Sequence, residues 1–127
     1  MSEKAERPTI LYVEDNRDNR VLVKRVLEAE GYRVLEAENA PQGIEVARTM
    51  RPSLILLDIN LPEIDGYEAT AQLRVLDELR GVPIIALTAN VMKGDREKTL
   101  AAGCSGYIQK PIDVDRLPEQ LAAFLQR

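Results

Sequence analysis

The stretch Leu54-Ile55-Leu56-Leu57-Asp58 decides the fold, because four consecutive apolar residues are followed at once by a carboxylate. An unbroken apolar run of this length predicts a strand that is buried on both faces, as the strands of a parallel sheet are. Residues 84–88 repeat the arrangement and end in the hydroxyl of Thr88, and residues 9–13 precede the acidic pair Glu14-Asp15. The sequence therefore predicts three strands that each lead into polar side chains.

Segments with helical periodicity lie between and after these strands. We expect two further strands at 33–37 and 106–109, and helices over residues 17–30, from Asn39 to 51, over 67–79, from Met92 or Gly94 to 102, and from Asp115 through Leu117, Leu121, Phe124 and Leu125. Gly31 and Gly103 are expected to end the helices that precede them. Asp115 is a better cap than Asp113 for the last helix, because Pro118 then lies in the first turn, where no N–H partner is needed.

The alternation of five strands with five helices predicts an α/β fold: a doubly wound, five-stranded parallel sheet in a (βα)5 three-layer sandwich. The flavodoxin-like strand order 2-1-3-4-5 brings the first and third strands side by side, so that Glu14, Asp15 and Asp58 share one pocket. Neighbouring carboxylates repel unless a cation compensates them, and hard oxygen ligands suit Mg²⁺. Thr88 and Lys110 end the fourth and fifth strands, and a hydroxyl and an ammonium group suit the oxygens of a transferred phosphoryl group.

The composition of the 127 residues excludes several classes of protein. The length fits one domain, which we place at residues 9–127 after a flexible tail at residues 1–8. One cysteine cannot form an internal disulfide, and the absence of histidine removes histidine bases and histidine-ligated metals. The net charge of -4 argues against direct nucleic-acid binding. Neither a membrane span nor a signal peptide is expected, which favours a cytoplasmic protein.

Four short motifs occur at the predicted strand ends: Val13-Glu14-Asp15-Asn16, Leu57-Asp58-Ile59-Asn60-Leu61-Pro62 with Asp65-Gly66, Leu87-Thr88-Ala89, and Lys110-Pro111. In this order and spacing they resemble the receiver domains of two-component response regulators. The resemblance extends from Ile10 to Leu125. Residues 92–95 and the pair Gly103-Cys104 are similar to those of single-domain regulators of the cell-division type and of receivers in hybrid kinases.

This resemblance implies a phosphoacceptor signalling module, which is not an enzyme but catalyses its own phosphorylation and dephosphorylation. Asp58 would be the phosphoacceptor, whose carboxylate becomes an acyl phosphate. Asp15 would bind Mg²⁺ directly and Glu14 directly or through water, with Asp58 and the backbone carbonyl of Asn60 completing the protein ligands. Glu14 stands where many members of the family carry aspartate.

The resemblance also implies which groups bind the phosphoryl oxygens. Lys110 would pair with one oxygen and Thr88 would donate a hydrogen bond to another, with help from the backbone N–H groups of Asn60 and Ala89. Alignment and charge neutralisation of this kind account for most of the catalysis of phosphoryl transfer. Asn60 and Asn90 occupy the two positions that tune dephosphorylation in the family.

A conformational switch follows from the same resemblance. Thr88 would move toward the phosphoryl group, and Tyr107, three residues before Lys110, would fill the space behind it. The face formed by the helix ending at 102, the strand 106–109 and the last helix would then control partner binding. A tyrosine on a short edge strand is also typical of half-buried packing, so both interpretations of Tyr107 stand. The implied partners are a sensor histidine kinase or histidine phosphotransfer protein and an effector protein, with the chain a monomer or weak homodimer.

Two other functions compete with this interpretation. An Mg²⁺-dependent aspartyl-phosphate phosphatase expects a second aspartate two residues after its nucleophile, where this chain has Asn60. A nucleotide-binding module needs a glycine-rich phosphate loop, which residues 14–16 do not supply. Because the chain has no histidine, a phosphoryl donor must be another molecule, either a phosphohistidine on a partner or a small acyl phosphate.

Overall fold

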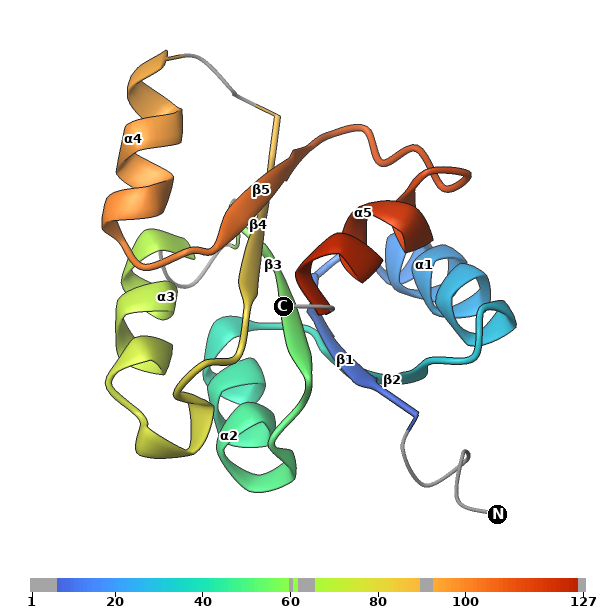
Figure 1. Ribbon diagram of the computed structural model, residues 1–127, viewed down its shortest axis with the longest axis horizontal. Coiled ribbons are helices and arrows are strands. Elements are labelled where there is room, and N and C mark those ends of the chain that lie inside the picture. The colour runs from blue at the N-terminus through green and yellow to red at the C-terminus, as the bar shows by residue number, and fades with distance from the viewer. Residues whose placement is uncertain (1–6, 60, 62–65, 90–92, 126–127) are drawn as a thin grey trace.

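The chain folds as a five-stranded parallel sheet between two layers of helices (Figure 1). The computed structural model describes residues 7–59, 61, 66–89 and 93–125. Its strands are β1 (Thr9–Val13), β2 (Arg33–Ala37), β3 (Leu54–Asp58), β4 (Ile84–Thr88) and β5 (Gly106–Gln109). Its helices are α1 (Arg17–Ala29), α2 (Ala40–Met50), α3 (Gly66–Arg74), the short 3-10 helix η2 (Asp77–Leu79), α4 (Lys93–Ala101) and α5 (Leu117–Leu125).

The strand order is β2-β1-β3-β4-β5, which confirms the predicted fold and order. Every pairing is parallel, and β1 lies between β2 and β3. Val13 pairs with Leu57, and Asp58 pairs with Leu87. The carboxyl ends of β1, β3 and β4 therefore reach the same edge of the sheet, which is where ligands bind in open α/β folds.

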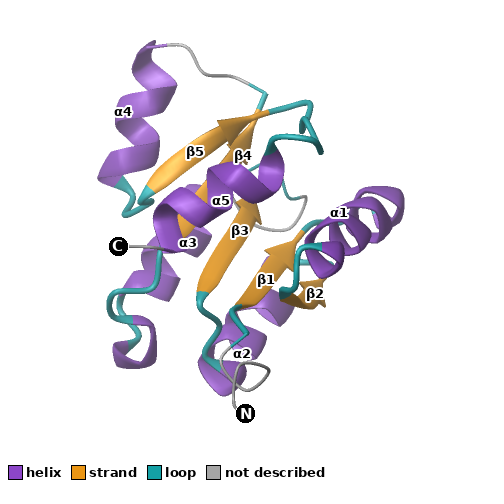
Figure 2. Ribbon diagram, turned by 45° about the vertical axis from the view of Figure 1, so that its right-hand side comes forward, coloured by secondary structure: helices purple, strands orange, loops and turns teal. Residues whose placement is uncertain are grey.

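Apolar side chains of the central strands pack on both faces of the sheet. All residues of β3 and β4 are buried, as their unbroken apolar runs predict. One core cluster joins the sheet to α1 and α5 through Val23, Leu27, Leu117 and Leu121. The other joins it to α2 and α3, and Figure 2 shows these helices on the opposite side of the sheet from α1 and α5. Each fully buried leucine or isoleucine contributes about 1.5–3 kcal/mol.

Side-chain caps and left-handed residues set the ends of several helices. Asn39 caps α2 as predicted, since its side chain accepts a hydrogen bond from the Gln42 N–H at 2.8 Å. Asn16 caps α1 in the same way through the N–H of Asn19. Gly31 and Gly103 have φ of +96° and +112°, so the predicted helix stops at these glycines are confirmed.

The predicted helix over residues 67–79 is wrong in its second half. α3 ends at Arg74, and η2 follows after a break. The N–H groups of Leu76 and Leu79 bond to carbonyls three residues back rather than four. Leu73 and Leu79 are both buried in the same core cluster, although residues six apart lie on different sides of a continuous helix. The break in the helix is what brings both leucines to one core.

The last helix starts close to where Pro118 predicts. α5 begins at Leu117, one residue later than a cap at Asp115 gives, and Pro118 lies in its first turn as expected. In the turn before α5, the Asp113 carboxylate accepts a hydrogen bond from the Asp115 N–H at 3.1 Å. Residues 1–6 of the predicted N-terminal tail lie outside the described residues. No helix in the described part of the chain is long and apolar enough to cross a membrane.

Candidate functional site

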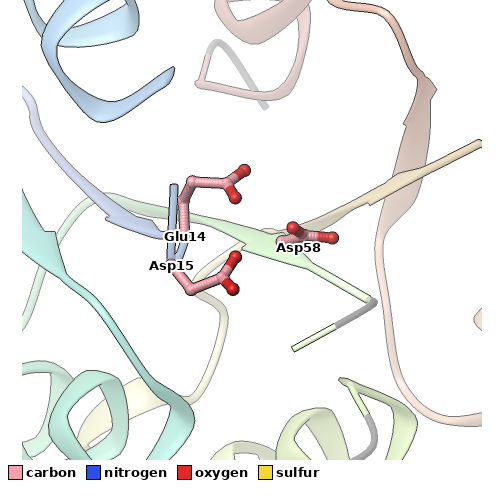
Figure 3. Close-up of side chains that lie close together, drawn as sticks. All are labelled: Glu14, Asp15 and Asp58. Carbon is pink, nitrogen blue, oxygen red and sulfur yellow. The ribbon is translucent and has the colours of Figure 1, made fainter. Parts of the chain in front are cut away.

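The polar residues predicted at the strand ends meet at one edge of the sheet. Carboxylate oxygens of Glu14, Asp15 and Asp58 lie within 4.8 Å of one another. Figure 3 shows the three side chains beside one another at the ends of β1 and β3. The Lys110 ammonium, which follows β5, lies 2.8 Å from Oδ1 of Asp58. The sheet order thus brings together residues that are far apart in sequence.

Two of the three carboxylates are shielded from water. Glu14 and Asp58 are each only 2% exposed, whereas Asp15 is exposed. Burial, followed by the negative charge of Asp58, raises the pKa of Glu14 to about 7. A divalent cation would remove this repulsion, and carboxylate oxygens are ligands that Mg²⁺ prefers. The donor set of the acidic cluster therefore fits Mg²⁺.

The ion pair between Lys110 and Asp58 joins two strands that are not neighbours in the sheet. Asp58 ends β3, Lys110 follows β5, and β4 lies between them. The Lys110 N–H donates to the Thr88 carbonyl at 2.8 Å, and the Ile59 N–H donates to the Leu87 carbonyl at 3.0 Å. These backbone bonds continue the hydrogen-bond pattern of the sheet past its last paired residues. The side chains of Asp58 and Lys110 therefore both start at the edge formed by the carboxyl ends of the strands.

Thr88, Ala89 and Tyr107 lie where the strand assignments predict. Thr88 is buried at the end of β4, and Ala89, directly after it, is exposed. Tyr107 pairs with Ala86 in the sheet, is half-buried, and packs against the core cluster that includes Ala86. This placement is compatible with both interpretations of Tyr107. The two other predicted site residues, Asn60 and Asn90, lie outside the described residues.

Sequence reasoning missed the residues that hold Glu14. The buried Tyr12 hydroxyl donates to Oε1 of Glu14 at 3.0 Å, and the Asn16 N–H donates to Oε2 at 3.2 Å. Arg20 donates to the Glu14 carbonyl at 2.7 Å and pairs with Glu36 of β2 at 3.4 Å. Residues two apart on a strand share a side, so the spacing places Tyr12 and Glu14 on one side, but it does not reveal that the hydroxyl bonds to the carboxylate.

A cavity of about 470 Å³ opens beside the site. It is lined by Glu14, Asn19, Leu22, Val23, Ala89, Lys110, Pro111 and Ile112. Charged groups of the site therefore share one hollow with apolar side chains of α1 and of the segment after β5. A larger cavity, of about 660 Å³, lies at the opposite edge of the sheet beside Ser53 and Pro83, which precede β3 and β4. Of these two cavities, the smaller one is lined by residues of the acidic site, namely Glu14 and Lys110.

Known proteins are similar to this chain both in sequence and in fold. The family model of the response regulator receiver domain matches residues 10–122. The polar-differentiation response regulator DivK of Brucella anthropi is 44% identical over 117 residues, which cover 92% of this chain and 95% of that protein.

Two solved structures illustrate the structural similarity. The receiver domain of the sensor histidine kinase PA1611 from Pseudomonas aeruginosa has a TM-score of 0.86 and 40% identity, with 95% of this chain and 99% of that one covered. That structure holds a magnesium ion in its active-site cleft. The chemotaxis response regulator CheY4 of Vibrio cholerae has a TM-score of 0.89 at 25% identity, with 93% of this chain and 98% of that one covered.

Proposed function

The chain belongs to the family of response regulator receiver domains, and on that premise we propose that it accepts a phosphoryl group on Asp58. One observation carries the proposal. The Asp58 carboxylate is buried at a strand end, with Lys110 at 2.8 Å on one side and the carboxylates of Glu14 and Asp15 within 4.8 Å on the other. This is a nucleophile placed between a fixed positive charge and a set of oxygen ligands for a cation.

The acidic cluster would hold Mg²⁺ through Asp15, Glu14 and Asp58, together with the backbone carbonyl of Asn60. When bound, Mg²⁺ supplies positive charge for the phosphoryl oxygens and removes the repulsion between the carboxylates. The exposure of Asp15 leaves the cluster open to solvent on one side. The buried Glu14, held through both of its oxygens, is suited to contact with the ion directly or through water.

In the proposed reaction, a carboxylate oxygen of Asp58 attacks the phosphorus of a phosphohistidine on a partner protein. The new O–P bond forms as the P–N bond breaks, and the electron pair of that bond returns to the imidazole nitrogen. Lys110 neutralises a phosphoryl oxygen, while Thr88 and the backbone N–H groups of Ala89 and Asn60 donate hydrogen bonds to the others. The side chains of Asn60 and Asn90 tune the later hydrolysis.

The cavity beside the site is the approach that we propose for the donor. Its lining combines Glu14 and Lys110 with the apolar side chains of Leu22 and Ile112. Leu22 is 49% exposed, so an approaching protein can contact it. This apolar part of the lining suits the surface of a sensor histidine kinase or histidine phosphotransfer protein in the cytoplasm, whose phosphohistidine would enter the cavity toward Asp58.

We propose that phosphorylation then alters the face formed by α4, β5 and α5, where an effector protein binds. Thr88 is buried at the end of β4, and Tyr107 lies on the neighbouring strand β5. A phosphoryl group adds negative charge and strong acceptor oxygens beside Thr88. Movement of the Thr88 hydroxyl toward these oxygens would leave space for the Tyr107 ring and change the exposed surface of β5.

The first test is modification by acetyl phosphate with Mg²⁺, measured as the intact mass of the protein. The second is binding of beryllium fluoride with Mg²⁺, measured by NMR. Wild-type protein should gain one phosphoryl group only when Mg²⁺ is present, and Asp58→Asn should gain none. Asp77→Asn is the matched control, because Asp77 is an exposed carboxylate in a surface pair with Arg80. Equal modification of wild type and Asp58→Asn would refute the proposal. Rapid multiple turnover on small phosphomonoesters would favour a phosphatase instead.

A further inference from the structure

We propose that Tyr12 is a positioning residue for the metal site, and that it requires glutamate rather than aspartate at position 14. The hydroxyl of Tyr12 lies 3.0 Å from Oε1 of Glu14, and both side chains are buried. The inference rests on the proposed function, because Glu14 belongs to the acidic cluster assigned to Mg²⁺. It adds to the site a buried residue that is not itself one of the three carboxylates.

Two donors fix the orientation of the Glu14 carboxylate. The Tyr12 hydroxyl donates to Oε1 and the Asn16 N–H donates to Oε2 at 3.2 Å. Each carboxylate oxygen has two acceptor sites, so each oxygen retains one for a cation or for a water bound to a cation. The carboxylate is therefore held by two donors, while one of its oxygens stays within 4.8 Å of carboxylate oxygens of Asp15 and Asp58.

The burial of Tyr12 restricts which hydrogen-bond acceptors its hydroxyl can reach. Tyr12 is completely buried in the core cluster between the sheet and α1 and α5, whose other buried members, such as Val23 and Leu87, are apolar. A buried hydroxyl needs an acceptor, and the Glu14 carboxylate is the acceptor that the structure gives it. The contact is therefore a constraint on both side chains and not an incidental surface bond.

The contact depends on the length of both side chains. Residues 12 and 14 lie on the same side of the extended chain, with α-carbons about 7 Å apart at the rise of a strand. Both side chains leave the strand on this side, and the glutamate is long enough for Oε1 to lie 3.0 Å from the Tyr12 hydroxyl. Aspartate at position 14 is one methylene shorter and would leave the Tyr12 hydroxyl buried without this acceptor. The structure therefore couples the glutamate at position 14 to the tyrosine at position 12.

The experiment measures Mg²⁺ affinity by calorimetry for wild type, Tyr12→Phe and Tyr32→Phe. Tyr32 is the matched control, because it is a half-buried tyrosine packed against the same cluster and outside the site. Loss of a hydrogen bond to a side chain that binds a metal weakens metal binding by roughly tenfold or more. We expect that loss for Tyr12→Phe and less than a twofold change for Tyr32→Phe. In a Glu14→Gln background, Tyr12→Phe should weaken binding no further, since its effect passes through the carboxylate.

A second measurement uses the wild-type protein, so it does not depend on the folding of a variant. With tyrosine labelled by ¹³C at Cζ, Mg²⁺ titration should shift the Tyr12 signal and leave the Tyr32 signal in place. An unmoved Tyr12 signal, or wild-type Mg²⁺ affinity in folded Tyr12→Phe, overturns the inference while Asp58 phosphorylation stands. A wild-type protein that binds no Mg²⁺ and is not modified at Asp58 overturns the proposed function as well.

Discussion

The Nζ atom of Lys110 lies 2.8 Å from Oδ1 of Asp58, across 52 residues of sequence and one intervening strand. Asp58 is almost completely buried and Lys110 is partly buried, so water screens this pair less than a surface pair. The ammonium group compensates part of the charge that Glu14, Asp15 and Asp58 concentrate at the edge of the sheet. It also stands where a phosphoryl group on Asp58 would need positive charge.

Replacing the lysine should therefore affect reaction and stability together. Lys110→Met should slow phosphorylation by acetyl phosphate about 100-fold, the usual cost of removing one charge-stabilising donor. It should also lower the free energy of unfolding by up to about 3 kcal/mol, because Asp58 loses its buried partner. Lys24→Met is the control, since Lys24 pairs with Glu36 on the surface at 3.3 Å. A rate within a factor of three of wild type would contradict the role of Lys110.

The raised pKa of Glu14 predicts how metal binding depends on pH. Because this pKa is about 7, Glu14 is largely protonated at pH 6 and ionised at pH 8. Mg²⁺ must displace that proton, so affinity should rise roughly tenfold from pH 6 to pH 8. Calorimetry in buffers of different ionisation enthalpy would count the released proton. Glu14→Gln should bind Mg²⁺ more weakly and lose most of this pH dependence.

The same pKa fixes the sign of a stability change in the metal-free protein. The pKa of Glu14 is raised from 4.5 when unfolded to about 7 when folded, so the folded state binds the proton more tightly. The favourable contribution of this proton to the free energy of unfolding is present in full below pH 4.5 and is lost as pH rises through 7. In urea unfolding with a chelator present, the free energy of unfolding of wild type should fall by about 1–3 kcal/mol between pH 5 and pH 8, relative to that of Glu14→Gln. A difference that grows in the opposite direction would contradict the assignment.

Gly66 should be intolerant of any side chain. A Cβ atom there would lie 2.5 Å from Cα and 2.9 Å from the carbonyl oxygen of Ile59, which follows Asp58 directly. Since backbone cannot move aside as a side-chain tip can, Gly66→Ala should destabilise the fold by about 1–3 kcal/mol. Gly43→Ala meets side-chain atoms of Val13 instead and gains helix propensity in α2, so its unfolding free energy should stay closer to wild type.

The apolar residues that line the site cavity predict a variant that separates docking from chemistry. Leu22→Asp should slow phosphotransfer from a phosphohistidine protein by at least about tenfold, because it places a charge in the proposed contact. The reaction with acetyl phosphate, which needs no docking surface, should proceed at the wild-type rate. Val75→Asp is the control, since Val75 is 78% exposed and does not line this cavity. Equal slowing with both donors would place Leu22 in the fold or the chemistry instead.

The switch proposal makes a prediction about Tyr107. With 3-fluorotyrosine incorporated, beryllium fluoride and Mg²⁺ should shift the ¹⁹F signal of Tyr107 and leave that of Tyr32 unchanged. Thr88→Ala removes the hydroxyl that would move toward the phosphoryl mimic, so the shift at Tyr107 should shrink even in protein that carries the adduct. A full shift in Thr88→Ala would show that the two residues are not coupled.

Local sequence patterns sufficed for the strands and for most of the site. The apolar runs before Asp58 and Thr88 are buried strands, and the strand order then determines that Asp58 meets Glu14 and Lys110. The end of α3 was not predictable from its own residues. It depends on the shared core position of Leu73 and Leu79, which only tertiary packing reveals.

The contact of Tyr12 with Glu14 escaped prediction for a different reason. Burial of the ring is enough to account for a tyrosine in an apolar strand, and no pattern in the sequence shows where its hydroxyl bonds. Its partner becomes evident only when the depth of Tyr12 in the core and the direction of the Glu14 side chain are both known. Positioning residues of this kind are specified by geometry rather than by a motif.

The order of the strands also determines when a growing chain can complete the site. Glu14 and Asp15 follow the first strand, whereas Lys110 follows the last, and a chain leaves the ribosome N-terminal end first. β1 and β3 are both synthesised before β5, so a nascent chain that paired these two strands would gather the acidic side chains before their ammonium partner exists. If Asp58 is the phosphoacceptor as proposed, a molecule becomes able to react efficiently only after the synthesis of β5 and Lys110.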